Sequence, residues 1–186
     1  TYFSLEETGL GYPCLPRGND GHNRPVLDAF LRVFGDAYRL RENPWEDGGE
    51  RQAEWYSGSE VGRNNRVRKF AAALWPEHEL DARIDEILRD FDTVGHRGGL
   101  LATASLSIRL VGEDDPYWRC SNCGRVHLHV GAKICTRCLF PIRETPSGKA
   151  KELRQESYLA KRIERDDQTF RLRCEELTGQ TDDPAD

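Results

Sequence analysis

Cys120-Ser121-Asn122-Cys123-Gly124 and Cys135-Thr136-Arg137-Cys138 form two C-x-x-C pairs, with eleven residues between Cys123 and Cys135. A C-x-x-C pair allows a tight turn to present two thiolates to one ion, and Gly124 permits the backbone to turn beneath it. Four thiolates complete the closed tetrahedral shell of structural zinc. The spacing therefore predicts one structural zinc ion, whose ligands are Cys120, Cys123, Cys135 and Cys138.

The residues between the two pairs have the alternating pattern of a strand. Val126, Leu128 and Val130 alternate with His127 and His129, which predicts one strand of a small hairpin and hence a zinc ribbon over residues 117–145. Because four cysteines already complete the shell, the two histidines are surplus as ligands. We expect them on the polar side of the strand, as surface groups or as donors close to the site. An iron–sulfur cluster is the rival, but two separate pairs that flank a strand favour zinc.

The remaining cysteines and the bulk composition suggest a water-soluble chain in a reducing compartment. Four of six cysteines are spaced for a metal rather than for disulfides, so we expect a cytoplasmic protein. Cys14 and Cys174 are isolated, and neither has a local histidine that would make it a nucleophile. No apolar run approaches the roughly 20 residues that span a bilayer, and residues 1–14 do not resemble a secretory signal. The chain starts with Thr1 and contains no Met, which suggests a segment of a longer protein.

Charge is distributed unevenly along the 186 residues. Residues 119–173 carry 13 Lys and Arg against 6 Asp and Glu, a balance of +7, whereas the rest carries 14 against 26, a balance of −12. The basic part contains the cysteine pairs, so Arg119, Arg125, Lys133 and Arg137 are candidate contacts to nucleic-acid phosphates. Tyr117 and His127 would assist by stacking on bases.

The remaining sequence predicts an α+β fold. Residues 1–62 read as an irregular connection that contains one helix, which begins near Pro25 and continues to Tyr38, and Trp45 and Trp55 would anchor the polar part to the core. Residues 63–116 predict two helices separated by Pro76 and then a half-buried strand over 106–110. This order fits a winged-helix unit, in which Arg63, Arg66, Arg68 and Lys69 would face phosphates, and it fits a generic α+β unit equally well. Residues 146–186 predict a charged helix over 149–166, with Leu153, Leu159 and Ile163 on its buried side, followed by a strand over 170–174.

No catalytic motif is present. The sequence has no G-x-x-x-x-G-K-[ST], G-x-G-x-x-G, H-E-x-x-H or G-x-S-x-G, and a four-thiolate zinc site leaves no open position for a zinc hydrolase.

A resemblance concerns residues 117–183. The stretch 170–182, FRLRCEELTGQTD, preceded by Trp118-Arg119-Cys120-Ser-Asn-Cys123-Gly124 and Cys135-Thr-Arg-Cys138, resembles the entry into the second RecA-like domain of large DEAD/DEAH-type helicases. The likeness is to the helicase-like proteins of bacterial phage-defence systems of the Druantia and DISARM type. The resemblance implies a longer parent helicase that binds ATP and Mg²⁺, with the nucleotide-binding loop, the acidic motif and the arginine finger outside this chain.

Two functions follow as hypotheses. The first is a zinc-binding, DNA-contacting segment of an ATP-dependent DNA translocase in anti-phage defence, with the rest of the helicase chain or other defence subunits as partners. The second is a zinc-ribbon module that docks a protein and does not bind nucleic acid. Salt dependence separates them, because phosphate contacts weaken steeply as salt rises.

Overall fold

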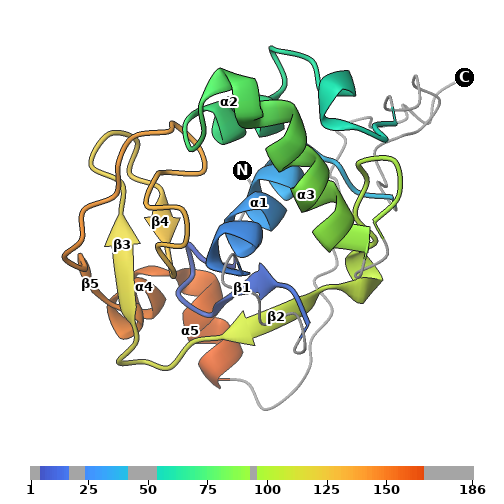
Figure 1. Ribbon diagram of the computed structural model, residues 1–186. Coiled ribbons are helices and arrows are strands. Elements are labelled where there is room, and N and C mark those ends of the chain that lie inside the picture. The colour runs from blue at the N-terminus through green and yellow to red at the C-terminus, as the bar shows by residue number, and fades with distance from the viewer. Residues whose placement is uncertain (1–4, 17–23, 42–53, 93–95, 166–186) are drawn as a thin grey trace, which may run out of the picture.

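The computed structural model describes residues 5–16, 24–41, 54–92 and 96–165 (Figure 1). Within these ranges the chain mixes helices with two small sheets, which confirms the predicted α+β class. Trp45, the predicted strand 170–174 and the stretch 170–182 lie outside the described residues. None of the described helices is both long enough and apolar enough to cross a membrane.

Helix α1 (Arg24–Asp36) is the centre of the main core. Pro25 occupies its first turn, where a missing N–H costs nothing, and every residue from 27 to 34 is buried. The prediction of this helix is confirmed, although it ends at Asp36 because Tyr38 adopts a left-handed backbone with a φ of 55°. Phe30 and Phe34 contact rings from the neighbouring helices edge-on, at centroid distances of 4.9 Å to Phe70 and 5.3 Å to Phe91.

The two predicted helices are α2 (Arg66–Ala72) and α3 (Leu80–Asp92), and both contribute side chains to the core around α1. The Asn65 side chain accepts a hydrogen bond from the Val67 N–H and caps α2, and Pro76 precedes the short 3₁₀ turn η2 (Glu77–Glu79) that leads into α3. The 3₁₀ turn η1 (Gly58–Glu60) joins α3 through a hydrogen bond from the Gly58 N–H to the Asp85 carboxylate. Trp55 is buried against this core, as expected.

Strand β2 (Ser107–Leu110), which follows the 3₁₀ turn η3 (Thr103–Ser105), pairs antiparallel with β1 (Gly11–Cys14). The predicted strand is confirmed, but its predicted half-burial is wrong, since Ile108 and Leu110 are 56 % and 75 % exposed. Alternation marks a strand, but it does not tell which face another layer will cover. Because β2 pairs with a strand that precedes α1, the described residues do not form the wing hairpin of a winged-helix unit.

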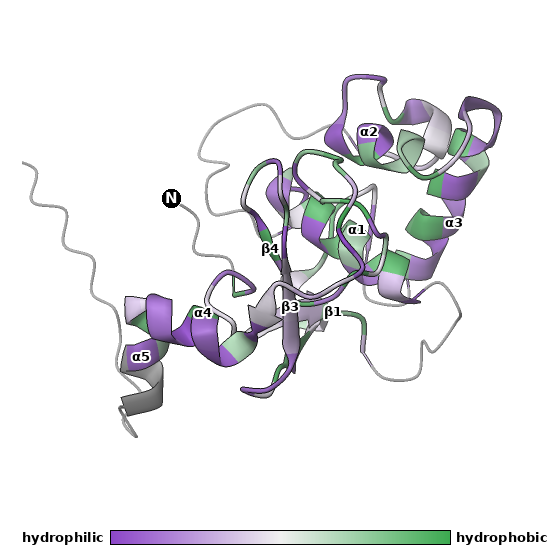
Figure 2. Cartoon of the chain, turned by 90° about the vertical axis from the view of Figure 1, so that its left-hand side faces the viewer, coloured by the Kyte–Doolittle hydropathy of each residue, from purple (hydrophilic) through white to green (hydrophobic). Residues whose placement is uncertain are grey.

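The second sheet has the order β4-β3-β5 and carries the cysteine pairs at its end. Strand β3 (Pro116–Arg119) pairs antiparallel with β4 (Val126–His127) and with β5 (Gly148–Lys149). The predicted long charged helix is instead two helices, α4 (Ala150–Glu156) and α5 (Tyr158–Arg165), because Ser157 between them has a non-helical ψ of 119°. Leu153 is buried as predicted, whereas Leu159 is only partly covered and the Ile163 side chain is not described. Figure 2 shows the strands between the α1–α3 group and the α4–α5 pair.

Contacts cross the predicted boundaries at residues 62 and 116. A second core joins side chains from four segments: Tyr12, Cys14, Tyr117, Val126, Leu128 and Leu153. From the ribbon, Ala132, Ile134 and Leu139 also pack against the helical core. The ribbon therefore packs against the rest of the described chain.

A substitution at Gly131 tests the packing of the ribbon against α1. A Cβ atom at Gly131 would lie 1.8 Å from the carbonyl oxygen of Pro25, at the start of α1. We expect Gly131→Ala to lower the free energy of unfolding by about 2 kcal/mol or more, because backbone must move to relieve the clash. Urea denaturation measures the loss. Gly62→Ala is the matched control, since a Cβ there meets nothing within 4 Å; equal stability of both variants would contradict the described contact.

Candidate metal centre

The four predicted cysteines come together at one point. Their sulfur atoms all lie within 4.8 Å of one another, and no other such metal-binding group occurs among the residues that the structure describes. The Sγ–Sγ distance is 3.5 Å between Cys120 and Cys138, and 3.6 Å between Cys123 and Cys135. Zn–S bonds of about 2.3 Å in a regular tetrahedron would place sulfurs about 3.8 Å apart. The arrangement can therefore hold one metal ion in a shell of four sulfurs.

The two C-x-x-C pairs lie in two backbone turns of the same type. In the first turn, the Cys120 N–H donates to the Arg125 carbonyl (2.8 Å) and the Gly124 N–H donates to the Cys120 carbonyl (2.9 Å). In the second turn, the Cys135 N–H donates to the Phe140 carbonyl (2.8 Å) and the Leu139 N–H donates to the Cys135 carbonyl (3.0 Å). The Arg137 N–H also points at the Cys135 sulfur, at 3.4 Å. Backbone hydrogen bonds thus position both pairs in an equivalent way.

The two turns differ in the residue that follows the second cysteine. Gly124 has a φ of 75° and Leu139 has a φ of 63°, so both adopt the left-handed conformation. Glycine takes this conformation without a steric penalty, whereas leucine pays one. Packing of Leu139 against the helical core offsets the penalty. The first turn is therefore specified by its own sequence, and the second depends on tertiary contact.

The local environment shifts the pKa values of the cysteine thiols in different directions. Burial raises the pKa of Cys135 to about 12 and also raises the pKa of Cys123. Burial also opposes ionisation of Cys138, but hydrogen bonds from the Asn122 side chain and the Phe140 N–H prevail and lower its pKa to about 6. A buried thiol of high pKa ionises when a cation binds it, so a metal ion would supply the charge that this site needs.

A bound ion also changes the charge of the ribbon. Residues 116–147 contain five Lys or Arg and one Glu, a balance of +4. Four thiolates and one divalent cation contribute −2, which leaves +2. The cations of the ribbon would therefore more than balance the negative charge of a metal–thiolate group.

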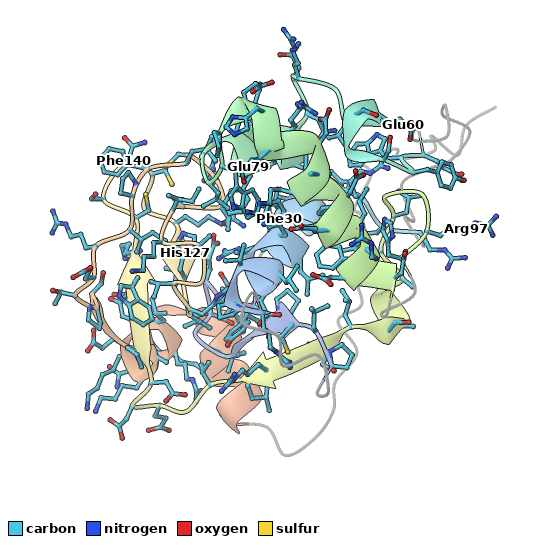
Figure 3. All side chains as sticks on the ribbon, in the orientation of Figure 1. Phe30, Glu60, Glu79, Arg97, His127 and Phe140 are labelled. Carbon is cyan, nitrogen blue, oxygen red and sulfur yellow. The ribbon has the colours of Figure 1, made fainter. Side chains whose placement is uncertain are left out.

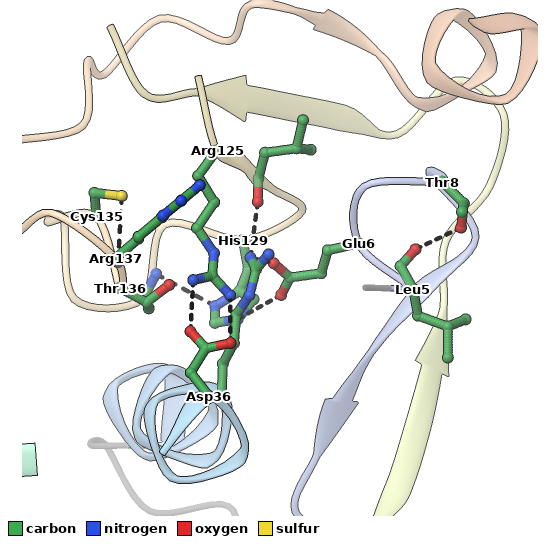
Figure 4. A network of polar contacts seen from close by, with 12 residues as sticks. Leu5, Glu6, Thr8, Asp36, Arg125, His129, Cys135, Thr136 and Arg137 are labelled. Atoms are coloured by element: carbon green, nitrogen blue, oxygen red, sulfur yellow. Dashed lines mark hydrogen bonds and ion pairs between the residues drawn. The ribbon is translucent and has the colours of Figure 1, made fainter. Parts of the chain in front are cut away.

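Arg125 is one of these cations, and it is buried in an ion pair. Its prediction as a surface contact to phosphates is therefore wrong. Its guanidinium forms a two-pronged pair with Asp36 at the end of α1, at 2.5 and 3.0 Å, and the residue is 8 % exposed (Figure 4). Arg66 reaches the same carboxylate at 3.3 Å and the Thr136 carbonyl at 3.1 Å. Arg32 donates to the Val126 carbonyl at 2.7 Å and pairs with the buried Glu6 carboxylate. The ribbon is thus joined to α1 by the Arg125–Asp36 ion pair and by the hydrogen bond from Arg32 to the Val126 carbonyl, both between segments far apart in the sequence.

His127 and His129 are not surface groups, and the stacking role predicted for Tyr117 and His127 is likewise not available. His127 is 3 % exposed and Tyr117 is 7 % exposed, so neither ring can reach a base. The His129 ring lies 4.5 Å from that of Tyr12, centroid to centroid. Burial, with the nearby Arg32 charge, lowers the pKa of His127 to about 3 and that of His129 to about 4. Both imidazoles are therefore neutral near pH 7.

The other predicted contacts lie on the surface. Arg119 and Arg137 line one hollow of about 210 Å³, together with Arg125, Glu7 and Glu156, and Arg119 pairs with Glu156 at 3.4 Å. Lys133 is exposed on the following loop. Of the predicted winged-helix contacts, Arg68 pairs with Asp81 at 2.7 Å and Arg66 with Asp36, whereas Arg63 and Lys69 are exposed.

Asp36 and Glu6 are the site residues that the sequence did not reveal. Asp36 lies 89 residues before Arg125, and neither acid belongs to a local motif. The only local hint is that α1, which also contains Asp28 and Arg32, ends in an acid. Which cation it meets follows from the packing of α1 on the ribbon.

Comparison with protein-family models, curated proteins and solved structures found no match for this chain. The resemblance to DEAD/DEAH-type helicases therefore stays a prediction from the sequence.

The buried histidines predict a loss of stability in mild acid. Below pH 6.5 the unfolded chain takes up a proton on each imidazole, whereas the folded chain takes up none until the pH nears 4 for His129 and 3 for His127. The unfolded state therefore binds more protons, and the free energy of unfolding should fall by about 2 kcal/mol per histidine from about pH 7 to pH 5. Denaturation with urea at several pH values measures this slope.

The matched variant is His127→Gln. Between pH 7 and pH 5 its free energy of unfolding should fall by about 2 kcal/mol less than that of the original chain, because one of the two histidines is missing. Bound metal is measured in each sample, and only pH values at which it is retained are compared. An unchanged slope in this variant would contradict a neutral, buried His127.

Proposed function

We propose that the chain binds one structural zinc ion through Cys120, Cys123, Cys135 and Cys138, and that the resulting ribbon contacts nucleic-acid phosphates without catalysing a reaction. The observation that supports the metal most directly is the closed group of four sulfurs. Thiolates favour zinc, copper(I) and iron–sulfur centres, and a tetrahedral set of four on two separate turns is typical of structural zinc. Four protein ligands leave no position for a substrate or an activated water.

Zinc loss is the direct test of this part. Cys135→Ser should lower the bound zinc of the reduced, purified protein from one equivalent to near zero, because Cys135 is a fully buried ligand. The same change should unfold the ribbon, since metal binding contributes on the order of 10 kcal/mol in small zinc modules. Elemental analysis measures the metal. Cys14→Ala is the control, because Cys14 is also buried but lies outside the sulfur group. One equivalent of zinc retained by the Cys135 variant would overturn the proposal.

Exposed cations of the second turn support the nucleic-acid part. Lys133, Arg137 and Arg143 are exposed, and among the described residues no ion pair engages them. The surrounding stretch 131–143 contains no Asp or Glu. Cations without a partner lose little on meeting a phosphate and release counterions from the nucleic acid when they do. Lys133 and Arg137 are kept from the predicted set and Arg143 is added, whereas Arg125 is removed because it is buried and Arg119 because it pairs with Glu156.

The wider proposal, an ATP-dependent DNA helicase or translocase of phage defence as the parent protein, is supported by the sequence resemblance over residues 117–183. In such a parent protein, the ribbon would contact the DNA strand while the motor domains hydrolyse ATP. Docking of a protein partner is the alternative, and salt dependence distinguishes the two.

A salt titration tests the phosphate contacts. The zinc-loaded chain is mixed with a fluorescently labelled duplex, and anisotropy gives the affinity between about 50 and 200 mM salt. Three phosphate contacts predict a loss of about 40-fold over this range. The triple variant Lys133→Ala, Arg137→Ala, Arg143→Ala should bind more weakly at low salt and lose most of this salt dependence, with its zinc retained.

The control removes the same charge from the helical part. Arg63→Ala, Lys69→Ala, Arg89→Ala takes away three exposed cations, two of which a winged-helix unit would use. This variant should bind like the original chain. A loss confined to this control would move the nucleic-acid surface to α2 and α3, and no binding by the original chain at about 50 mM salt would overturn the phosphate contacts.

A further inference from the structure

Phe140 is an aromatic side chain that the packing of the ribbon leaves in solvent. It follows the second cysteine pair and is 47 % exposed, although nothing in the mechanism of metal binding requires an aromatic ring there. In Figure 3 it lies at the outer edge of the ribbon, whereas the nearby His127 lies inside. The exposed ring therefore offers a face for contact with a ligand.

The backbone beneath Phe140 is fixed. Its carbonyl accepts the Cys135 N–H at 2.8 Å, and the Ile142 N–H donates to the Lys133 carbonyl at 2.9 Å. Between these two bonds Ile134 and Pro141 form a bridge, so residues 133–135 and 140–142 make a short antiparallel ladder. Because Cys135 is also a metal ligand in the proposed site, a bound metal would hold this backbone as well. A ring on a fixed backbone can stack without the entropy cost of ordering the chain that carries it.

The surroundings of Phe140 indicate the partner. Three exposed cations border Phe140 along the backbone: Lys133 lies across the ladder from Ile142, Arg143 follows Ile142, and Arg137 lies in the turn before Phe140. Arg137 also lines the hollow that contains Glu7 and Glu156, so Lys133 and Arg143 are the cations nearest to Phe140 that lie outside that hollow, and their charge suits a polyanion. Phe140 is also the one large hydrophobic residue that is exposed between residues 116 and 147, with only Pro141 exposed beside it. A stable protein interface buries about 800 Å² on each partner, far more than one exposed ring supplies, whereas a nucleobase needs only one ring face and neighbouring cations.

We infer that Phe140 is a stacking platform for an unpaired base, and that the surface formed by Lys133, Arg137, Phe140 and Arg143 prefers single-stranded over duplex nucleic acid. This inference rests on the proposed phosphate contacts and adds the strand preference. Stacking does not depend on base identity, so the surface accepts strands of any sequence. In a duplex the base faces are already stacked, and Phe140 would then contribute nothing.

Two oligonucleotides with equal numbers of phosphates separate stacking from charge. One is an oligothymidylate of about 12 nucleotides, and the other is an abasic strand of the same length. The zinc-loaded chain should bind the oligothymidylate at least about fivefold more tightly than the abasic strand. Phe140→Ala should bind both strands like the abasic one, with its zinc content and salt dependence unchanged. Phe140→Trp should keep the preference, and its added indole emission should be quenched by the oligothymidylate but not by the abasic strand.

Tyr56→Ala is the matched control, since Tyr56 is an exposed aromatic side chain (66 %) on the helical part and should not affect either affinity. Equal binding of both strands by the original chain, with no change in Phe140→Ala, would overturn the stacking role and leave the phosphate contacts intact. No binding to either strand or to a duplex would instead overturn the phosphate contacts. A polyglutamate peptide that competes as strongly as the oligothymidylate, and loses affinity in Phe140→Ala, would assign the surface to an acidic protein.

Discussion

The four-sulfur shell is the constraint on which the ribbon depends. Strands β4 and β5 have two residues each, and such short strands contribute few hydrogen bonds and little packed surface. A metal ion at the sulfurs would close the chain from Cys120 to Cys138 into a rigid unit, and its binding free energy would become folding free energy. The same unit carries Ala132, Ile134 and Leu139 into the helical core. In the proposed zinc-bound state, the metal therefore orders both the ribbon and one side of the domain.

Buried charge links this unit to α1. The Asp36 carboxylate receives Arg125 and Arg66, and the Glu6 carboxylate receives Arg32, so cations near the metal are matched by acids from other segments. Removal of one partner from such a pair leaves an uncompensated buried charge, which is far more costly than the pair is stabilising. His127 and His129 stay neutral in this cationic surrounding. The side of the ribbon that faces α1 is thus occupied by buried contacts, whereas Lys133, Arg137, Phe140 and Arg143 of the second turn are exposed.

The basic residues of this segment fall into two groups: some are buried or paired with acids, and others are exposed. The excess of basic residues in the sequence suggests one continuous phosphate-binding surface, but folding divides it. Arg125 is buried, Arg119 meets Glu156, and Lys149 meets Asp114 at 2.9 Å. The exposed Lys133, Arg137 and Arg143 stay in a stretch without acids, next to an exposed ring. In the proposed nucleic-acid role, such a surface would combine long-range attraction of a polyanion with a short-range contact to a base.

The sequence by itself determined the features that depend on local spacing. Two C-x-x-C pairs predicted which sulfurs meet, helical periodicity predicted α1, α2 and α3, and alternation predicted β2, because each of these follows from a repeat of two to four residues. Tertiary structure decided whatever depends on distant partners. The exposure of Ile108 and Leu110, the burial of His127 and the pairing of Arg125 with Asp36 depend on which surfaces meet, and a one-dimensional pattern does not contain that information. The physical reason is that residue type sets the cost of burial, whereas only the packed chain determines which residues are buried and what compensates them.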